Sequence, residues 1–452
     1  MEKIYVGAGA GFGGDRSDAA EAVVRQLKTC PGPRFLVYET LAERTLAAAQ
    51  LLRAGDPDKG YAPRLRSYIE PVLQECLASN IRIVSNFGAA NPRAAARLIQ
   101  EIAQRQGGPL PRIAIVEGDD LIDTLNLSEL RERELPAGVL RDDSRLVSAN
   151  AYLGAFQIAE ALDAGVDIVI TGRVADPSLV LGPMIHAFKI AEDDWDMLAT
   201  GTLAGHLIEC GAQVTGGYFA DPGIKDVPDM ANIGYPIAEI GRNGECVITK
   251  PEGTGGIVDL RTVKEQLLYE IHDPACYLTP DVVLDVTGVT LHQDGPDRVR
   301  VSGARGAPRP ERLKATVCVE SGTLAEGEIS YAGDNAMGRA QLAARIIRER
   351  VRQRYPDSAP RIDFIGALSV LGSNEKFHDE ISEGSNSRDI RVRFALSSPD
   401  QTHARYLLEE VEALYCSGPA GGAGVRTRLS SRLATTSCVI ERSLITPRIS
   451  YL

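Results

Sequence analysis

Two adjacent carboxylates follow an apolar run in this sequence, at the point where a strand would end. The stretch is VEGDD, and its two adjacent acids are Asp119 and Asp120. Acids in such a place could hold Mg²⁺ with water molecules that complete the coordination shell, or one of them could act as a general acid or base. They could instead cap a helix that begins within GDDLID. The sequence leaves these three interpretations open.

A second candidate is a solitary arginine at the end of another apolar run, in TGRVADPSL. The guanidinium of Arg173 suits a carboxylate or phosphate ligand, and the alternative is an internal ion pair. Asp176 precedes Pro177, which is well placed as the first residue of a helix. We therefore expect Asp176 to cap that helix, and it is also a candidate catalytic acid beside the arginine.

The third candidate is the histidine of GHLIECGAQVTGG, which has the pattern of a helix followed by a loop. His206 shares a helix face with Cys210, and Glu209 is close by. His206 could move a proton together with Glu209, and Cys210 could be a thiolate nucleophile. The Leu and Ile residues of this helix are equally typical of a core face. A zinc site rich in histidine is not expected, because the HExxH and HxxEH spacings are absent from the sequence.

A glycine-rich stretch, GAGFGG, follows the first apolar run and precedes a helical pattern. Its candidate binding residues are Gly11, Gly13, Gly14, Asp15 and Arg16. One match to GxGxxG, with Glu39 after the second strand, is compatible with a dinucleotide cradle. The helix, however, starts late for that motif, with Ser17 as its better cap. The loop could instead offer backbone N–H groups and Arg16 to another anion, or it could be a structural turn.

These residues are positioned by an alternation of strands and helices. Short apolar runs lie at residues 4–6, 35–38, 81–85, 113–116 and 167–171, and helical patterns at 18–28, 41–54, 64–78, 92–106 and 151–164. Such alternation predicts a doubly wound, mostly parallel sheet. Ligands bind beyond the carboxyl ends of its strands. We therefore expect the polar residues there, including Asn86 and Asn91, to meet in one crevice.

The texture changes after Gly216. An Asn243-Gly244 hairpin turn, longer antiparallel strands and three helical patterns predict an α+β half. The expected organisation is α/β overall, with a Rossmann-like domain at residues 1–215 and an α+β domain at 216–452 packed against it. No apolar run reaches the roughly 18 residues of a membrane span.

The net charge bears on the partners of the protein, and the cysteines bear on its location. The 452 residues carry a net charge of −12 without a basic block, which argues against nucleic acid. There is no export signal and no CxxC pair among the eight cysteines, so we expect reduced thiols in a cytoplasmic protein. A homo-oligomer is expected.

The chain also resembles a known family, the acyclic terpene utilisation family, AtuA. The resemblance rests on motifs in the same order along nearly the whole chain: GAGAGFGGDR, LAERTLAAAQ, SNFGAANP, EGDDL, ANAYLGAFQIAEAL, TGRVADPSLVLGP, GTLAGHLIECGAQVTGG, GYPIAEI, TVKEQLLYEIHDPACYLTPDV, VRVSGARG and GPAGGAG. Many members carry a further C-terminal ferredoxin-like domain. This chain is expected to be a short form without it, because it stops at Leu452 soon after RSLITPRIS. The resemblance implies a place beside acyl-CoA enzymes in the breakdown of branched acids and terpenoids.

Three functions follow as hypotheses. The favoured one is a hydratase or lyase that acts without a redox cofactor on a branched or terpenoid carboxylate or its CoA thioester. In it, Arg16 and Arg173 hold an anionic group, Asn86 and Asn91 orient a carbonyl, and Asp120 or His206 moves the proton. The alternatives are an NAD(P)-dependent oxidoreductase and a non-catalytic subunit of an acyl-CoA assembly. No cofactor is firmly implied, although Mg²⁺ could bind.

Overall fold

The computed structural model describes residues 2–370 and 387–452, and the chain forms two compact units. Unit 1 is the chain up to Cys318 together with Thr435–Leu452, and unit 2 is Val319–Ala434. Unit 2 is therefore an insertion into unit 1. Unit 1 extends past the boundary expected at residues 215–216, because strands that follow that boundary pair with the first strand of the chain.

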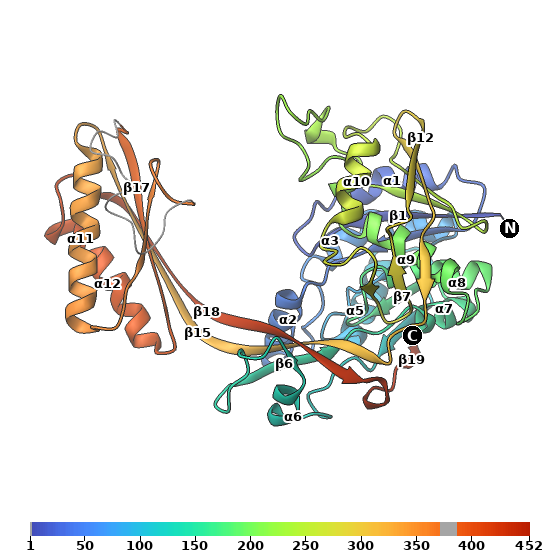
Figure 1. Cartoon of the computed structure of the whole chain (residues 1–452), viewed down its shortest axis with the longest axis horizontal. Helices are drawn as coiled ribbons and strands as arrows, with labels where there is room; N and C mark the ends of the chain where they lie inside the picture. Colours follow the sequence, from blue (N-terminus) through green and yellow to red (C-terminus); the bar gives the residue numbers. More distant parts are fainter. Residues whose placement is uncertain (1, 371–386) are drawn as a thin grey trace. The chain divides into compact units, whose positions relative to one another are not determined.

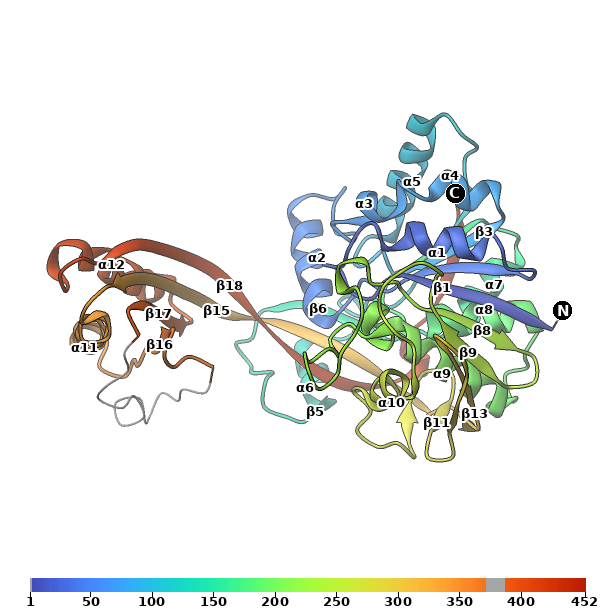
Figure 2. The same ribbon diagram turned by 90° about the horizontal axis from the view of Figure 1, so that it is seen from above.

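Unit 1 is built on one 10-stranded sheet (Figure 1 and Figure 2). Its order is β12-β13-β9-β8-β1-β2-β3-β7-β4-β19. The strands are β1 (Lys3–Ala10), β2 (Arg34–Tyr38), β3 (Ile81–Ser85), β4 (Ile113–Glu117), β7 (Ile168–Thr171), β8 (Ile237–Gly241), β9 (Cys246–Thr249), β12 (Thr290–Gly295), β13 (Arg298–Ser302) and β19 (Arg448–Tyr451). The run from β1 to β4 is parallel, and the flanking strands are antiparallel. The α/β class with a mostly parallel N-terminal sheet is confirmed.

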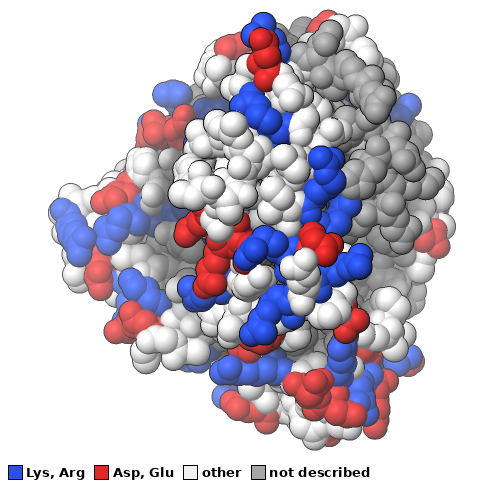
Figure 3. Space-filling view, turned by 90° about the vertical axis from the view of Figure 1, so that its left-hand side faces the viewer, with Lys and Arg blue, Asp and Glu red and all other residues white. Residues whose placement is uncertain are grey.

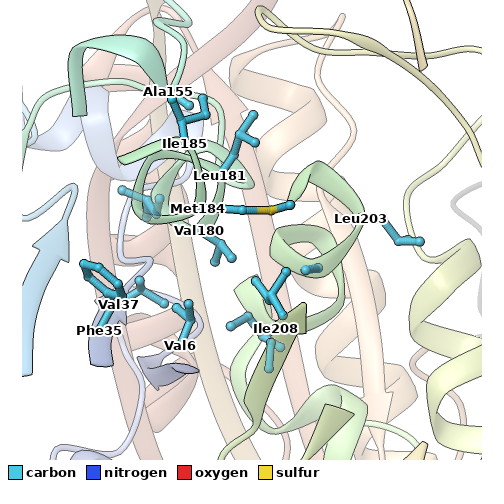
Figure 4. Close-up of a cluster of buried hydrophobic side chains, with 14 of the residues drawn as sticks. Val6, Phe35, Val37, Ala155, Val180, Leu181, Met184, Ile185, Leu203 and Ile208 are labelled. Carbon is cyan, nitrogen blue, oxygen red and sulfur yellow. The ribbon is translucent and has the colours of Figure 1, made fainter. Parts of the chain in front are cut away.

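Helices cover both faces of the parallel strands. The helices of unit 1 are α1 (Ala19–Leu27), α2 (Glu43–Gly55), α3 (Leu65–Ile69), α4 (Leu73–Ala78), α5 (Pro92–Gln106), α6 (Leu127–Glu132), α7 (Phe156–Asp163), α8 (Ser178–Phe188), α9 (Trp195–Glu209) and α10 (Leu260–Leu268). On one face, α7, α8 and α9 pack against Val6, Phe35 and Val37 (Figure 4). On the other, α1, α3, α4 and α5 pack against Leu36 and Ile83. This burial of both faces explains why the parallel strands read as continuous apolar runs.

Two expected helices differ from the observed ones. The pattern at residues 64–78 is divided into α3 and α4 around Pro71, which has no N–H to continue the ladder. The pattern at 151–164 yields only α7, because the preceding residues form β6 (Leu146–Ala151), which pairs with β15 (Arg312–Ala332). Pairing with a strand far along the chain is not visible in local periodicity.

Unit 2 has the element order βαββαβ of a ferredoxin-like unit. Its elements are β15 (Arg312–Ala332), α11 (Ala336–Arg354), β16 (Arg361–Ile365), β17 (Asp389–Ser398), α12 (Gln401–Ser417) and β18 (Ala423–Glu441). The strand order is β16-β17-β15-β18, and α11 and α12 pack on one face of the sheet. This unit is not among the domains expected from the sequence, where a ferredoxin-like domain was considered only beyond Leu452.

Charges of unit 2 are interspersed rather than segregated by sign. On its sheet, Arg391 pairs with Glu328 at 3.4 Å and Arg393 with Asp363 at 2.7 Å. Figure 3 likewise shows Lys and Arg among Asp and Glu over the visible described surface. None of the described helices combines the length and apolar character that a membrane crossing requires.

Candidate active site

A cavity of about 1030 Å³ lies in unit 1, at the carboxyl ends of three parallel strands. Segments that directly follow β1, β2 and β7 line it, together with the last turn of α9 and the beginning of β15. All of these segments belong to unit 1. The location agrees with the rule that ligands of doubly wound sheets bind beyond the carboxyl strand ends.

Arg173 is the most deeply buried cation of this cavity, with 1% of its surface exposed. Its Nη1 donates to the carbonyl of Leu41 at 2.6 Å and to Asp176 at 3.2 Å. The guanidinium carbon lies 4.5 Å from the centre of the Tyr152 ring. Its Nε is buried without a hydrogen-bond partner among the described residues. A permanently charged group held this firmly is suited to fix an anionic part of a ligand.

Glu39 lies on the same wall and is held by neighbouring groups. One carboxylate oxygen accepts from the backbone N–H of Leu41 at 2.8 Å and from the Asn86 side chain at 2.9 Å. Burial raises the pKa of Glu39 to about 8, with a further contribution from Asp176, although Arg173 opposes the shift. Glu39 is therefore protonated near neutral pH and able to donate a proton.

His206 and Glu209 form an acid–base pair at the end of α9. Nδ1 of His206 lies 3.3 Å from Glu209, and Nε2 lies 2.9 Å from the carbonyl of Gln266. Burial raises the pKa of Glu209 to about 7. Burial alone would lower the pKa of His206, but the contact with Glu209 outweighs it, and the pKa is raised. Oε2 of Glu209 is buried without a hydrogen-bond partner in the described chain. A pair that titrates near neutrality is suited to proton transfer.

A second ion pair of the cavity includes Lys314, near the beginning of β15. Lys314 pairs with Glu43 at 3.4 Å, and its Nζ lies 4.8 Å from the Tyr152 ring centre. The hydroxyl of Tyr152 donates to Glu43 at 2.8 Å. Burial would raise the pKa of Glu43, yet the Tyr152 hydroxyl and Lys314 lower it to about 2. Glu43 is thus ionised near neutral pH, whereas Glu39 is protonated.

The glycine-rich loop packs closely against the end of α9, although Gly11 and Asp15 also line the cavity. Gly11 leaves no room for a side chain, since a Cβ there would lie 2.3 Å from the backbone carbonyl carbon of Cys210. Asp15 accepts from the backbone N–H of Gly11 at 2.8 Å and from the hydroxyl of Tyr235. The Cβ side of Gly11 is thus occupied by the backbone of Cys210 and Gly211. The geometry therefore favours the structural-turn interpretation of this loop.

The structure brings some of the predicted residues into the cavity and leaves others outside it. The lining includes Gly11, Asp15, Glu39, Arg173, Asp176 and His206. The residues outside the lining are Gly13, Gly14, Arg16, Asn86, Asn91, Asp119 and Asp120. The expected grouping of Arg16, Asn86, Asp120 and Arg173 in one crevice is thus not found, because only Arg173 lines the cavity.

Arg16, Asn86 and Asn91, which lie outside the lining, have contacts that explain their positions. Arg16 pairs with Asp18 at 2.8 Å. Asn91 caps α5 by accepting from the N–H of Ala94. The side-chain amide of Asn86 donates to the carboxylate of Glu39. These contacts support folding roles for Arg16 and Asn91 and a positioning role for Asn86.

The adjacent acids Asp119 and Asp120 diverge. Asp119 is buried and accepts from Asn150 at 2.8 Å and from the backbone N–H of Arg173 at 3.0 Å. Burial raises its pKa to about 6. Asp120 contacts Gln50 at 3.2 Å and Arg53 at 3.9 Å near the surface. Two carboxylates that point apart do not form a joint Mg²⁺ site, and within the described ranges no cluster of three His, Cys, Asp or Glu residues could hold a metal.

Sequence reasoning missed several lining residues, notably Glu43, Tyr152, Lys314 and Tyr277. Glu43 lies only four residues beyond Glu39, so a wider window after the second strand would have included it. Lys314 and Tyr277 come from the second half of the chain, and no local pattern links them to the N-terminal strands. Tyr152 lies directly after β6, a strand that the pattern of residues 151–164 concealed.

One comparison with known proteins identifies a family. The model of the acyclic terpene utilisation family protein AtuA matches residues 4–451 of the chain. No curated protein matches it. Because the match spans nearly the whole sequence, this protein belongs to the acyclic terpene utilisation family, AtuA.

Proposed function

We propose that unit 1 is an enzyme that moves protons on a branched, acyclic carboxylate or its CoA thioester, as hydratases and lyases do. The observation that carries the proposal is the convergence of the His206–Glu209 pair, the protonated Glu39 and the buried Arg173 on one cavity. Perturbed titratable groups around a cation in a cavity are typical of catalytic sites. Membership of the AtuA family suggests a role in acyclic terpene utilisation.

The lining supports a substrate with an anionic or carbonyl end and an apolar body. Arg173, Lys314 and Arg312 supply positive charge on one part of the wall. Acidic side chains lie on the wall as well, among them Glu39, Asp176 and Glu209. Apolar and aromatic side chains form much of the remainder: Phe12, Leu41, Pro177, Tyr218, Tyr235, Tyr269, Tyr277, Leu278, Pro280, Pro310, Leu313 and Val439. Apolar and aromatic lining with convergent polar groups is typical of small-molecule sites. A branched hydrocarbon chain with a carboxylate or thioester head fits both parts.

The two acid–base groups divide the chemistry of a hydration. When Glu209 is ionised, the His206–Glu209 pair takes one proton from water. The water oxygen then bonds to the β-carbon of an unsaturated acyl group. Protonated Glu39 gives one proton to the α-carbon, so that the double bond becomes single and atoms balance. Arg173 stabilises the negative charge that develops on the carbonyl oxygen. The elimination of water is the same path reversed.

The test is proton exchange in heavy water, because it detects acid–base catalysis in either direction. Wild-type protein is incubated with branched acids and their CoA thioesters, and deuterium at the α-carbon and addition of water are followed by mass spectrometry. We expect Glu209→Gln to slow both by about 10²–10⁴-fold, the usual contribution of a positioned acid or base. Asp120→Asn is the control, since Asp120 lies outside the cavity.

Two outcomes would contradict the proposal. One is a wild-type protein that neither exchanges nor hydrates any of these acids, which would favour a non-catalytic subunit of an acyl-CoA assembly. The other is a Glu209→Gln variant as active as the Asp120→Asn control. The cytoplasmic location and the homo-oligomer remain predictions.

A further inference from the structure

A second cavity, of about 360 Å³, lies at the opposite edge of the parallel strands. Its wall includes the first residue of β2 and the first two residues of β3, together with residues that precede β4 and β7. It shares no lining residue with the large cavity. Any ligand of this second cavity is therefore independent of the function proposed above.

The second cavity is strongly basic. Three arginines line it, Arg34, Arg82 and Arg112, together with His186 and a single carboxylate, Asp167. Asp167 is engaged by Arg112, whose backbone N–H donates to it at 2.8 Å and whose Nε lies 3.7 Å away. Arg34 and Arg82 have no carboxylate partner among the described residues. This concentration of positive charge is unusual in a chain whose net charge is −12.

Contacts with helix C-termini use only some of the N–H donors of Arg34 and Arg82. Nη1 of Arg34 donates to the carbonyl of Lys28, the C-cap of α1, at 3.4 Å. Nη1 of Arg82 lies 3.4 Å from the carbonyl of Leu162, in the last turn of α7. Arginines at helix C-termini are favoured by the helix dipole. Each guanidinium carries five N–H groups, however, so these contacts leave most of the donors available.

The described residues offer few partners for the remaining donors. Nε of Arg34 is buried without a hydrogen-bond partner among the described residues. Nη1 of Arg82 lies 2.8 Å from Nε2 of His186, whose Nδ1 contacts Asp163. Because Asp163 holds His186 from the far side of the ring, the imidazole has a fixed orientation beside Arg82. Guanidinium donors around a small cavity suit an oxyanion, because several N–H groups can donate to its oxygens.

We infer that this basic cavity binds a small phosphate-class oxyanion. Inorganic phosphate and a phosphate group carried on a small metabolite share the chemistry that would be recognised. The cavity volume is close to the lower limit of small-molecule sites. The ligand is expected to stabilise the folded protein, because the strands and helices that carry the arginines come together only on folding.

The test is calorimetric titration of the full chain with inorganic phosphate at low ionic strength. A second arm uses the phosphorylated adenosine portion of coenzyme A, to distinguish a free anion from a nucleotide-borne phosphate. We expect Arg34→Gln and Arg82→Gln each to weaken binding by about tenfold or more, which corresponds to one lost charge-assisted contact. The control is Arg105→Gln, an exposed arginine of α5 that pairs with Glu101 outside the cavity.

Two further measurements keep the test decisive. Arg82→Lys retains the charge and is expected to lie between wild type and Arg82→Gln, which covers the case in which Arg82→Gln does not fold. Binding to wild type is expected to weaken as ionic strength rises. The inference is overturned if neither probe binds wild type, or if Arg34→Gln and the folded Arg82 variants bind as tightly as Arg105→Gln.

Discussion

At the carboxyl edge of the parallel strands the large cavity gathers acids around one buried arginine, whereas at the amino edge the small cavity gathers three arginines around one acid. Both cavities belong to unit 1 and to the same sheet. Helix ends account for much of this contrast. Glu43 is the first residue of α2, where negative charge is favoured, and Arg34 and Arg82 meet helix C-termini. Asp176 precedes α8 but does not form the expected cap, because the N-cap is Pro177 and no side chain caps this helix.

Glu209 departs from this pattern. It lies in the last turn of α9, where a negative charge is disfavoured by the helix dipole, and it is buried. The match between charge and helix end therefore explains the positions of Glu43, Arg34 and Arg82. It does not explain Glu209, an acid that folding alone does not require. An unfavourable buried acid in a cavity is typical of a functional group.

The largest expected effect on stability is that of replacing Arg173, which lies at the carboxyl edge of the parallel strands. Arg173→Met should lower the free energy of unfolding by about 3–5 kcal/mol, because it leaves the Leu41 carbonyl and Asp176 without their buried cation. Arg82→Met, at the basic edge, should cost only about 1 kcal/mol, since Arg82 has no carboxylate partner in the described chain. Urea denaturation of both variants measures the difference. Equal costs would show that the two edges do not differ as described.

The next effect is on the pH dependence of stability. Glu39 has a pKa of about 8 in the folded protein, against 4.5 in the unfolded chain. The folded state therefore holds more protons between these values, and stability falls as pH rises through this window. Glu39→Gln should remove that fall. Between pH 5 and pH 8, the free energy of unfolding of the variant should rise relative to that of wild type by about 2–4 kcal/mol. Parallel pH profiles for the two proteins would contradict the buried, protonated Glu39.

The smallest effect concerns the loop that leads into the large cavity. Gly11→Ala should lower stability by about 1–3 kcal/mol, because its Cβ would lie 2.3 Å from the backbone of Cys210. Gly55→Ala is the matched control, since nothing lies within 4 Å of its added Cβ, and a gain of about 0.5–1 kcal/mol is expected. Thermal unfolding compares the two. An unchanged melting temperature for Gly11→Ala would reopen the ligand-loop interpretation.

Much of the parallel sheet could be predicted from the sequence because its signals are local. β3 and α5 have the bounds that their apolar run and their Asn-Pro start indicate. Unit 2 could not be predicted in this way. It begins and ends within long strands, β15 and β18, so no linker composition marks its boundaries.

The candidate site was predictable to the same degree. The rule that ligands lie beyond strand ends places Glu39, Arg173 and Asp176 correctly at the cavity, because it fixes where each backbone segment lies. It does not fix the direction of a side chain. Asp119 and Asp120 follow the same strand, yet their carboxylates point to different neighbours, and Arg16 turns to Asp18 instead of the crevice.

The insertion of unit 2 has a consequence for how the protein is made on the ribosome. Unit 2 is a single continuous segment and is complete as soon as Ala434 has been synthesised. Unit 1 is not complete at that point, because β19 pairs with β4 and Val439 completes the wall of the large cavity, and both are translated after the whole of Val319–Ala434. The N-terminal strands must therefore wait, with one sheet edge unpaired, until synthesis has passed the insertion.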